Sequence, residues 1–318
     1  MKDLRIIFIG TPDFSVASLN ALIEANKNVV AVITAPDRKA GRGQKMNQSA
    51  VKKYAVERNI PVLQPTNLKN EAFITELQSY RASLQIVVAF RMLPEVVWNM
   101  PSNGTFNLHA SLLPNYRGAA PINWAIINGE KETGVTTFFL KHKIDTGDLI
   151  FQERVSISEQ ETAGTLHDKL MTIGSELVVR TVDSIQNNRV NAIAQQEIES
   201  KEAPKIFKNN CQVDWSASST EIDRLVRGMS PFPTTWSTLY HAEGGKTVNV
   251  KIFAVEKSED KSLLSGELKI EENEIFVGAK DCDIKLVEIQ VEGKKRMPVK
   301  DLLNGFHFEG YSFKNKKL

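Results

Sequence analysis

Short apolar runs that alternate with helical patterns are the feature that most constrains this fold. Four runs rich in Ile, Val, Leu and Phe have the length of buried strands, at residues 4–9, 29–34, 84–90 and 105–109. Apolar residues with helical spacing predict helices between them, at 11–25, 50–59 and 71–80. This alternation predicts an α/β domain with a largely parallel sheet.

The second half of the chain has a different texture. At 318 residues the chain is too long for one ordinary core. A helix predicted at 165–186 is followed by a polar, aperiodic stretch typical of a linker, and a short helix is predicted at 219–229. Short strands follow and predict a small barrel or sandwich, at 235–240, 247–256, 267–270, 274–278 and 283–292. We therefore expect domains at 1–189 and 209–318, joined by a linker at 190–208.

Composition and missing motifs exclude several classes of protein. The content is 42% hydrophobic and 25% charged, with a net charge of +2, as in an ordinary globular protein. No apolar run approaches the roughly 20 residues of a membrane helix, so we expect a cytoplasmic protein without membrane contact. The two cysteines, Cys211 and Cys282, form no motif, and the five histidines are scattered, so we expect no metal.

Asn107 and His109 are the first candidates for chemistry. They stand two positions apart on a predicted strand, so both side chains project to one face at its carboxyl end. An amide and an imidazole can together hold an oxyanion, and a carboxylate behind the imidazole would orient its ring. Asp145 is the candidate carboxylate and Asp148 is its rival. The group has no nucleophile, which suits direct acyl transfer to an amine, although the same residues also suit an ordinary polar strand end.

A longer pattern around these residues resembles the folate-dependent formyltransferases. It consists of Asn-x-His-x-Ser-Leu-Leu-Pro at 107–114 and a distant Asp-x-Gly at 145–147. Segments that begin at Phe8, Ala35 and Gln212 are similar to the branch of that family that acts on methionyl-tRNA. The resemblance implies a doubly wound, Rossmann-like domain, a linker and an OB-like β-barrel. It also implies transfer of a formyl group from 10-formyltetrahydrofolate to the α-amino group of methionine on initiator tRNA, for translation initiation.

The resemblance also assigns roles to residues. It implies that Asn107, His109 and Asp145 are catalytic, and that the folate site is lined by Ser111, Leu112, Leu113 and Pro114. It places a basic, tRNA-binding loop after the second strand, where we select Arg38, Lys39, Arg42 and Lys45. Taken without the resemblance, these charges favour an ordinary solvated loop, since runs of charge usually lie on a solvated surface. We expect a monomer.

The chain departs from the family pattern in two places. Phe90-Arg91-Met92 stands where the family commonly has a Tyr-Gly stretch that is one residue longer, and His142-Lys143 makes the segment before Asp145 more basic than is usual. Details of the pterin pocket at these positions are therefore not transferred.

Two other functions remain open. A sugar-nucleotide N-formyltransferase shares the Asn-x-His and Leu-Leu-Pro core, but has little use for a basic loop and an OB-like domain. A noncatalytic RNA-binding protein would use the barrel and leave the triad without a role. Basic residues in the C-terminal part suit RNA contact or a plain solvated surface equally well: Lys294, Lys295, Arg296 and Lys300, and Lys314, Lys316 and Lys317 at the tail.

Overall fold

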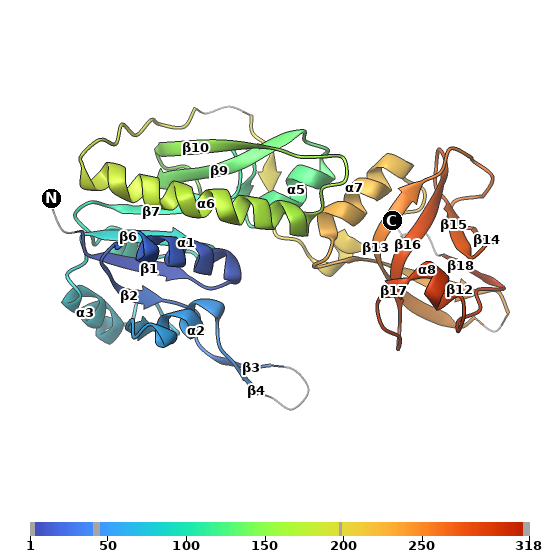
Figure 1. Ribbon diagram of the computed structural model, residues 1–318, viewed down its shortest axis with the longest axis horizontal. Helices are drawn as coiled ribbons and strands as arrows, with labels where there is room; N and C mark the ends of the chain where they lie inside the picture. Colours follow the sequence, from blue (N-terminus) through green and yellow to red (C-terminus); the bar gives the residue numbers. More distant parts are fainter. Residues whose placement is uncertain (1–3, 41–44, 197–198, 244, 314–318) are drawn as a thin grey trace. The chain divides into compact units, whose positions relative to one another are not determined.

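The computed structural model describes residues 4–40, 45–196, 199–243 and 245–313. Contacts divide the chain into two compact units (Figure 1). Unit 1 contains Met1–Pro121, Glu132–Ser156 and His167–Ala203, and unit 2 contains Ile122–Lys131, Ile157–Leu166 and Pro204–Leu318. The segments 122–131 and 157–166 are thus grouped with the C-terminal residues, so no single position in the sequence separates the two units. The limits at 1–189, 190–208 and 209–318 stay a prediction.

Unit 1 is built on a seven-stranded sheet in the order β10-β9-β7-β6-β1-β2-β5. The strands from β7 to β5 are parallel, and β9 and β10 are antiparallel additions. Their bounds are β1 Ile6–Gly10, β2 Val29–Ile33, β5 Val62–Leu63, β6 Leu84–Val88, β7 Thr105–His109, β9 Glu132–Phe139 and β10 Leu149–Ser156. This confirms the doubly wound, mainly parallel sheet.

Helices cover both faces of this sheet because its central strands are apolar on both sides. All five residues of β1 are buried. Ile7 and Ile9 pack in one cluster with Phe73 of α3 and Val97 of α4. The helices that precede the predicted linker are α1 Asp13–Glu24, α2 Ala50–Glu57, α3 Glu71–Ser79, α4 Glu95–Trp98, α5 Pro121–Ile127 and α6 Ala163–Gln186. Local signals set their starts, since Ser49 and Asn70 cap α2 and α3 through their side chains.

Two small strand pairs in unit 1 were not predicted from the sequence. The segment predicted as a basic loop contains the antiparallel strands β3 Arg38–Ala40 and β4 Lys45–Asn47. Farther along, β8 Arg117–Gly118 pairs in parallel with β11 Glu202–Ala203. The second pair fixes part of the predicted linker onto unit 1.

Unit 2 is an antiparallel barrel in the order β14-β15-β16-β13-β12-β18, with β17 beside β16. Its elements are η1 Lys208–Cys211 (a 3₁₀ helix), α7 Ser219–Met229, β12 Thr235–His241, β13 Thr247–Lys257, β14 Leu268–Glu271, β15 Glu274–Gly278, β16 Asp283–Val291, β17 Met297–Pro298, α8 Val299–Leu302 and β18 Tyr311–Phe313. The backbone N–H of Phe313 donates to the carbonyl of Gly266 at 2.8 Å, which brings β18 to the start of β14. The barrel is therefore nearly closed, as the OB-like prediction requires.

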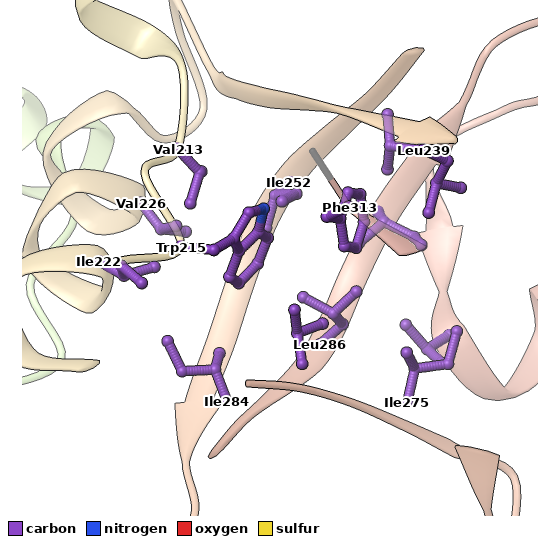
Figure 2. Packing of buried hydrophobic residues seen from close by; sticks show 14 of the residues in the cluster. Val213, Trp215, Ile222, Val226, Leu239, Ile252, Ile275, Ile284, Leu286 and Phe313 are labelled. Carbon is purple, nitrogen blue, oxygen red and sulfur yellow. The ribbon is translucent and has the colours of Figure 1, made fainter. Parts of the chain in front are cut away.

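The core of unit 2 is centred on Trp215, which is fully buried (Figure 2). Its ring stacks on Phe313 with 5.0 Å between the ring centroids. Its indole N–H donates to the Ser237 hydroxyl at 3.0 Å, so the one polar atom of the side chain is satisfied.

None of the helices in the described ranges has the length and hydropathy to span a bilayer.

Candidate active site

Asn107 and His109 lie at the carboxyl end of β7, between β6 and β9. Asn107 pairs with Val87 of β6, and His109 pairs with Thr136 of β9. Asn107 is half-buried, and its side-chain amide makes no hydrogen bond to another described residue. The amide is therefore ready to donate to a bound group.

His109 is 6% exposed, and both of its ring nitrogens face protein groups. Nε2 lies 2.8 Å from the carbonyl oxygen of Tyr116. A carbonyl can only accept, so Nε2 carries a hydrogen atom. Nδ1 lies 3.8 Å from Oδ2 of Asp145, which is an ion-pair separation and longer than a hydrogen bond. Nδ1 therefore faces the Asp145 carboxylate but does not form a hydrogen bond with it.

The carboxylate of Asp145 is held by the backbone of β8. Its Oδ2 accepts from the N–H of Gly118 at 3.0 Å. Gly118 has a φ of +123°, and a Cβ there would lie 2.5 Å from the carbonyl oxygen of Ala203. Only glycine fits this position, so the Arg-Gly pair in the turn supplies a specific support for Asp145.

The backbone of Asp145 is fixed by two side chains that the sequence analysis missed. Asp145 has a φ of +53°. Its carbonyl accepts from Nε2 of Gln195 at 2.8 Å and from Nε of Arg117 at 3.2 Å. The same Gln195 nitrogen also donates to the carbonyl of Gly147 at 2.8 Å. Gln195 lies in the aperiodic segment predicted as a linker, so no local signal pointed to it.

Asp148 faces a different group. Its carboxylate lies 2.7 Å from Nζ of Lys141. The structure thus brings Asp145, rather than its rival, against His109. The glycine between them is also required, since a Cβ on Gly147 would lie 1.5 Å from the carbonyl oxygen of Phe139.

The segment 111–114 packs partly into the protein. Ser111 and Leu113 are buried, whereas Leu112 and Pro114 are half-buried. The Ser111 hydroxyl donates to the carbonyl of Asn115 at 2.7 Å, and its own carbonyl accepts from Thr136 at 2.6 Å. Ser111 and Leu113 therefore shape the segment, and Leu112 and Pro114 present its accessible surface.

The predicted tRNA-binding residues lie on the β3–β4 hairpin. Arg38 and Lys39 are exposed on β3. Arg42 falls outside the described residues, and Lys45 belongs to β4. Within the described part of the chain, no group of three or more His, Cys, Asp or Glu side chains is arranged to hold a metal ion.

The two segments that depart from the family pattern each make local contacts. The Arg91 guanidinium donates to the carbonyls of Pro65 and Thr66 at 2.6 and 3.1 Å. Nε2 of His142 lies 3.6 Å from a carboxylate oxygen of Glu95. A side chain of each segment, Arg91 or His142, is therefore held by neighbouring protein groups at the carboxyl edge of the sheet.

Comparison with known proteins connects this geometry to a family. Residues 4–182 match the family model described as formyl transferase, and residues 205–307 match the one for the formyl transferase C-terminal domain. A methionyl-tRNA formyltransferase from Bacteroides thetaiotaomicron is 51% identical over 317 residues, which covers 98% of both chains. One from Flavobacterium johnsoniae is 52% identical over 310 residues, covering 97% of this chain and 98% of the relative.

A solved structure supports the fold at lower identity. WlaRD, a sugar 3N-formyl transferase crystallised in the presence of dTDP and 5-N-formyl-THF, is 19% identical with a TM-score of 0.65. The match covers 93% of this chain and all of that one. With both domains matched and half of all residues shared with full-length relatives, the chain belongs to the formyl transferase family.

Proposed function

We propose that this protein is a methionyl-tRNA formyltransferase, which transfers the formyl group of 10-formyltetrahydrofolate to the α-amino group of methionine on initiator tRNA. The observation that carries the proposal is the convergence of Asn107, His109 and Asp145 at one strand end, in a chain about half identical to enzymes of that name. The product is N-formylmethionyl-tRNA for translation initiation.

Asn107 and His109 stabilise the formyl oxygen as it becomes an oxyanion. The Asn107 amide makes no hydrogen bond to another described residue, so it can donate to the formyl oxygen without breaking one. Because the Nε2–H of His109 is committed to the Tyr116 carbonyl, the ring donates from Nδ1 as the imidazolium, with Asp145 as its counter-ion. At 3.8 Å the contact of Nδ1 with Asp145 leaves that hydrogen available to a substrate oxygen. Two such donors suit the tetrahedral intermediate of acyl transfer.

Asp145 handles the proton that the reaction displaces. The α-amino group arrives as an ammonium ion and must lose a proton before its nitrogen attacks the formyl carbon. Asp145 accepts that proton. The bond between the formyl carbon and N10 of the folate then breaks, and N10 takes up a proton as it leaves. The amide product and tetrahydrofolate result, with one proton released overall.

The remaining assignments complete the proposal. Leu112 and Pro114 contact the folate, and Ser111 and Leu113 hold that segment in shape. Arg38, Lys39, Arg42 and Lys45 bind tRNA phosphates. The protein works as a monomer in the cytoplasm, with 190–208 as the linker between its domains.

One assay tests the reaction. The purified protein is given 10-formyltetrahydrofolate with charged initiator tRNA, charged elongator tRNA or an amino-sugar nucleotide. We expect formylation of the initiator tRNA with a clear preference over the elongator. Formylation of the sugar nucleotide alone would establish the second function, and tRNA binding without any transfer would establish the noncatalytic one.

A further inference from the structure

A row of three side chains crosses the sheet of unit 1 at the end of β7. His109 of β7 lies directly opposite Thr136 of β9 in the antiparallel register, and Thr136 in turn lies opposite Gln152 of β10. Opposite residues of antiparallel strands have their side chains on one face, with Cβ atoms about 5 Å apart. The imidazole of His109 therefore stands at one end of a row whose other two members have no part in the proposed chemistry.

The hydroxyl of Thr136 holds the backbone on both sides of Leu112. The side chain is fully buried. Its hydroxyl donates to the carbonyl of Ser111 at 2.6 Å and accepts from the backbone N–H of Leu113 at 3.2 Å. It also accepts from Nε2 of Gln152 at 3.0 Å. A hydroxyl has one hydrogen atom and two lone pairs, so these three partners use its full capacity.

Gln152 holds the same segment at a further point. Its Nε2 also donates to the carbonyl of Leu113 at 2.9 Å. Two side chains thus bind three backbone groups of residues 111–113, a stretch that lies outside the helices and strands. A buried backbone group that loses its partner costs about as much as a lost hydrogen bond, so the chain has little freedom to take another path there.

The side chain of Leu112 is seated on β9 as well. Gly134 and Thr136 stand two positions apart on this strand and so face the same side of the sheet. A Cβ on Gly134 would lie 2.5 Å from Cδ2 of Leu112 and 2.0 Å from the carbonyl oxygen of Glu153. The strand that pairs with His109 therefore also sets the place of Leu112.

We propose that Thr136 and Gln152 are positioning residues of formyl transfer. They hold the segment 111–114, and with it the folate, where the formyl oxygen meets the donor on His109. The proposal rests on the proposed function, in which Leu112 and Pro114 contact the folate. Thr136 and Gln152 act only through the backbone of the segment. A misplacement of about 1 Å can cost roughly 10²-fold in rate, so the fixed path of this segment is a requirement of the reaction.

The next residue of β9 supplies a matched control. Thr137 is also fully buried, but it faces the other side of the sheet, where its hydroxyl lies 3.0 Å from that of Thr181 on α6. Valine keeps the shape of threonine and removes the hydroxyl. Thr136→Val and Thr137→Val therefore each lose buried hydrogen bonds of one residue type in one strand, and only the first releases the segment 111–113.

Single-turnover rates with both substrates saturating test the positioning role. We expect Thr136→Val and Gln152→Leu to lower kcat roughly tenfold, because the formyl group no longer meets its donors in the right geometry. Thr136→Ser keeps the hydroxyl and should restore most of the rate. Thr137→Val should match wild type in kcat, although its unfolding free energy, measured by denaturant titration, should fall about as much as that of Thr136→Val.

Binding measurements separate the two substrates. Isothermal titration calorimetry with tetrahydrofolate needs no turnover, and we expect Thr136→Val to raise its Kd about threefold through loss of hydrogen bonds that hold the segment. The KM for methionyl-tRNA should stay at the wild-type value. Hydrogen exchange at the Leu113 amide, followed by NMR, should become faster in Thr136→Val and stay unchanged in Thr137→Val, which confirms that the segment is released.

The outcomes that contradict the proposal are distinct. Equal losses of kcat in Thr136→Val and Thr137→Val would reduce the effect to general stability and overturn it. Faster exchange at Leu113 with kcat unchanged would show that the anchored path does not serve the reaction, and would overturn it as well. Failure of the wild-type protein to bind tetrahydrofolate would instead count against the proposed function, and the proposal would fall with it.

Discussion

The strand end around His109 and the barrel core around Trp215 bury side chains for opposite reasons. The strand end buries polar groups: the Thr136 hydroxyl, fully buried, donates to the Ser111 carbonyl and accepts from Gln152 at 3.0 Å. The barrel core buries large apolar groups, with Trp215 stacked on Phe313 (Figure 2).

This difference predicts that the stability of the fold and the rate of the reaction depend on different residues. Apolar burial stabilises a fold in proportion to the area removed from water, whereas a buried hydrogen bond contributes little net stability but fixes geometry. Substitutions in the barrel should therefore lower the free energy of unfolding. Substitutions at the strand end should mainly lower kcat.

Trp215→Ala should have the largest effect on stability. Removing a fully buried indole should cost about 3–5 kcal/mol of unfolding free energy, measured by denaturant titration. Trp236→Ala is the matched control, because that ring is half-buried beside Lys208 and should cost clearly less. Equal losses would mean that burial does not distinguish the two positions.

Asn107→Ala should have the largest effect on chemistry. Loss of one oxyanion donor should lower kcat about 10²-fold or more, roughly 3 kcal/mol. Its stability should match wild type, since the amide has no described partner. His109→Ala should lose similar activity and also about 1 kcal/mol of stability, because it removes the donor to the Tyr116 carbonyl. Near-normal turnover by either variant would refute the proposed roles.

Asp145→Asn and Asp148→Asn should separate the two carboxylates. The first should lower kcat by about 10²-fold or more through loss of the proton acceptor, while folate binding persists. The second breaks only a partly exposed pair with Lys141 and should change kcat within about twofold. The comparison is made by single-turnover rates with both substrates saturating. The reverse ranking would show that Asp148 is the catalytic carboxylate.

Gln195→Ala should have an intermediate effect, although the residue touches no substrate in the proposal. Without its amide, the carbonyls of Asp145 and Gly147 lose a shared donor, and we expect kcat to fall roughly tenfold with KM little changed. Cleavage within 190–208 by trypsin should also become faster, because Gln195 ties that segment to unit 1. Unchanged cleavage with reduced kcat would mean that other contacts hold the segment. Gln195→Glu is a useful companion variant because it keeps the length but not the donor.

The smallest effect is expected at Cys211, in unit 2. Burial raises the pKa of the Cys211 thiol, so a smaller fraction of it is thiolate than in an unburied cysteine at the same pH. Alkylation by iodoacetamide at neutral pH should label the half-buried Cys282 first, without loss of formylation. Mass spectrometry of partly labelled protein identifies the site. Faster labelling of Cys211 would show that this part of unit 2 opens readily.

Elements whose signals are local were predicted well from the sequence. The strand at 105–109 and the helix at 219–229 have the predicted limits in the structure. The helix is set by its own capping box, in which Ser218 and Glu221 satisfy each other's backbone N–H groups. The β3–β4 hairpin escaped prediction because its strands are three residues each and rich in basic residues.

The sequence by itself determined the alternation of strands and helices, the barrel strands and the placement of Asn107 and His109 on one face of β7, because periodicity and capping act over a few residues. Only the tertiary structure decided which carboxylate meets His109, which side chains hold that carboxylate, and which ones hold the segment 111–113. Gln195 and Asp145 lie 50 positions apart. Contacts at such separations depend on how the strands of unit 1 assemble and how β8 pairs with β11, and no local pattern encodes that assembly.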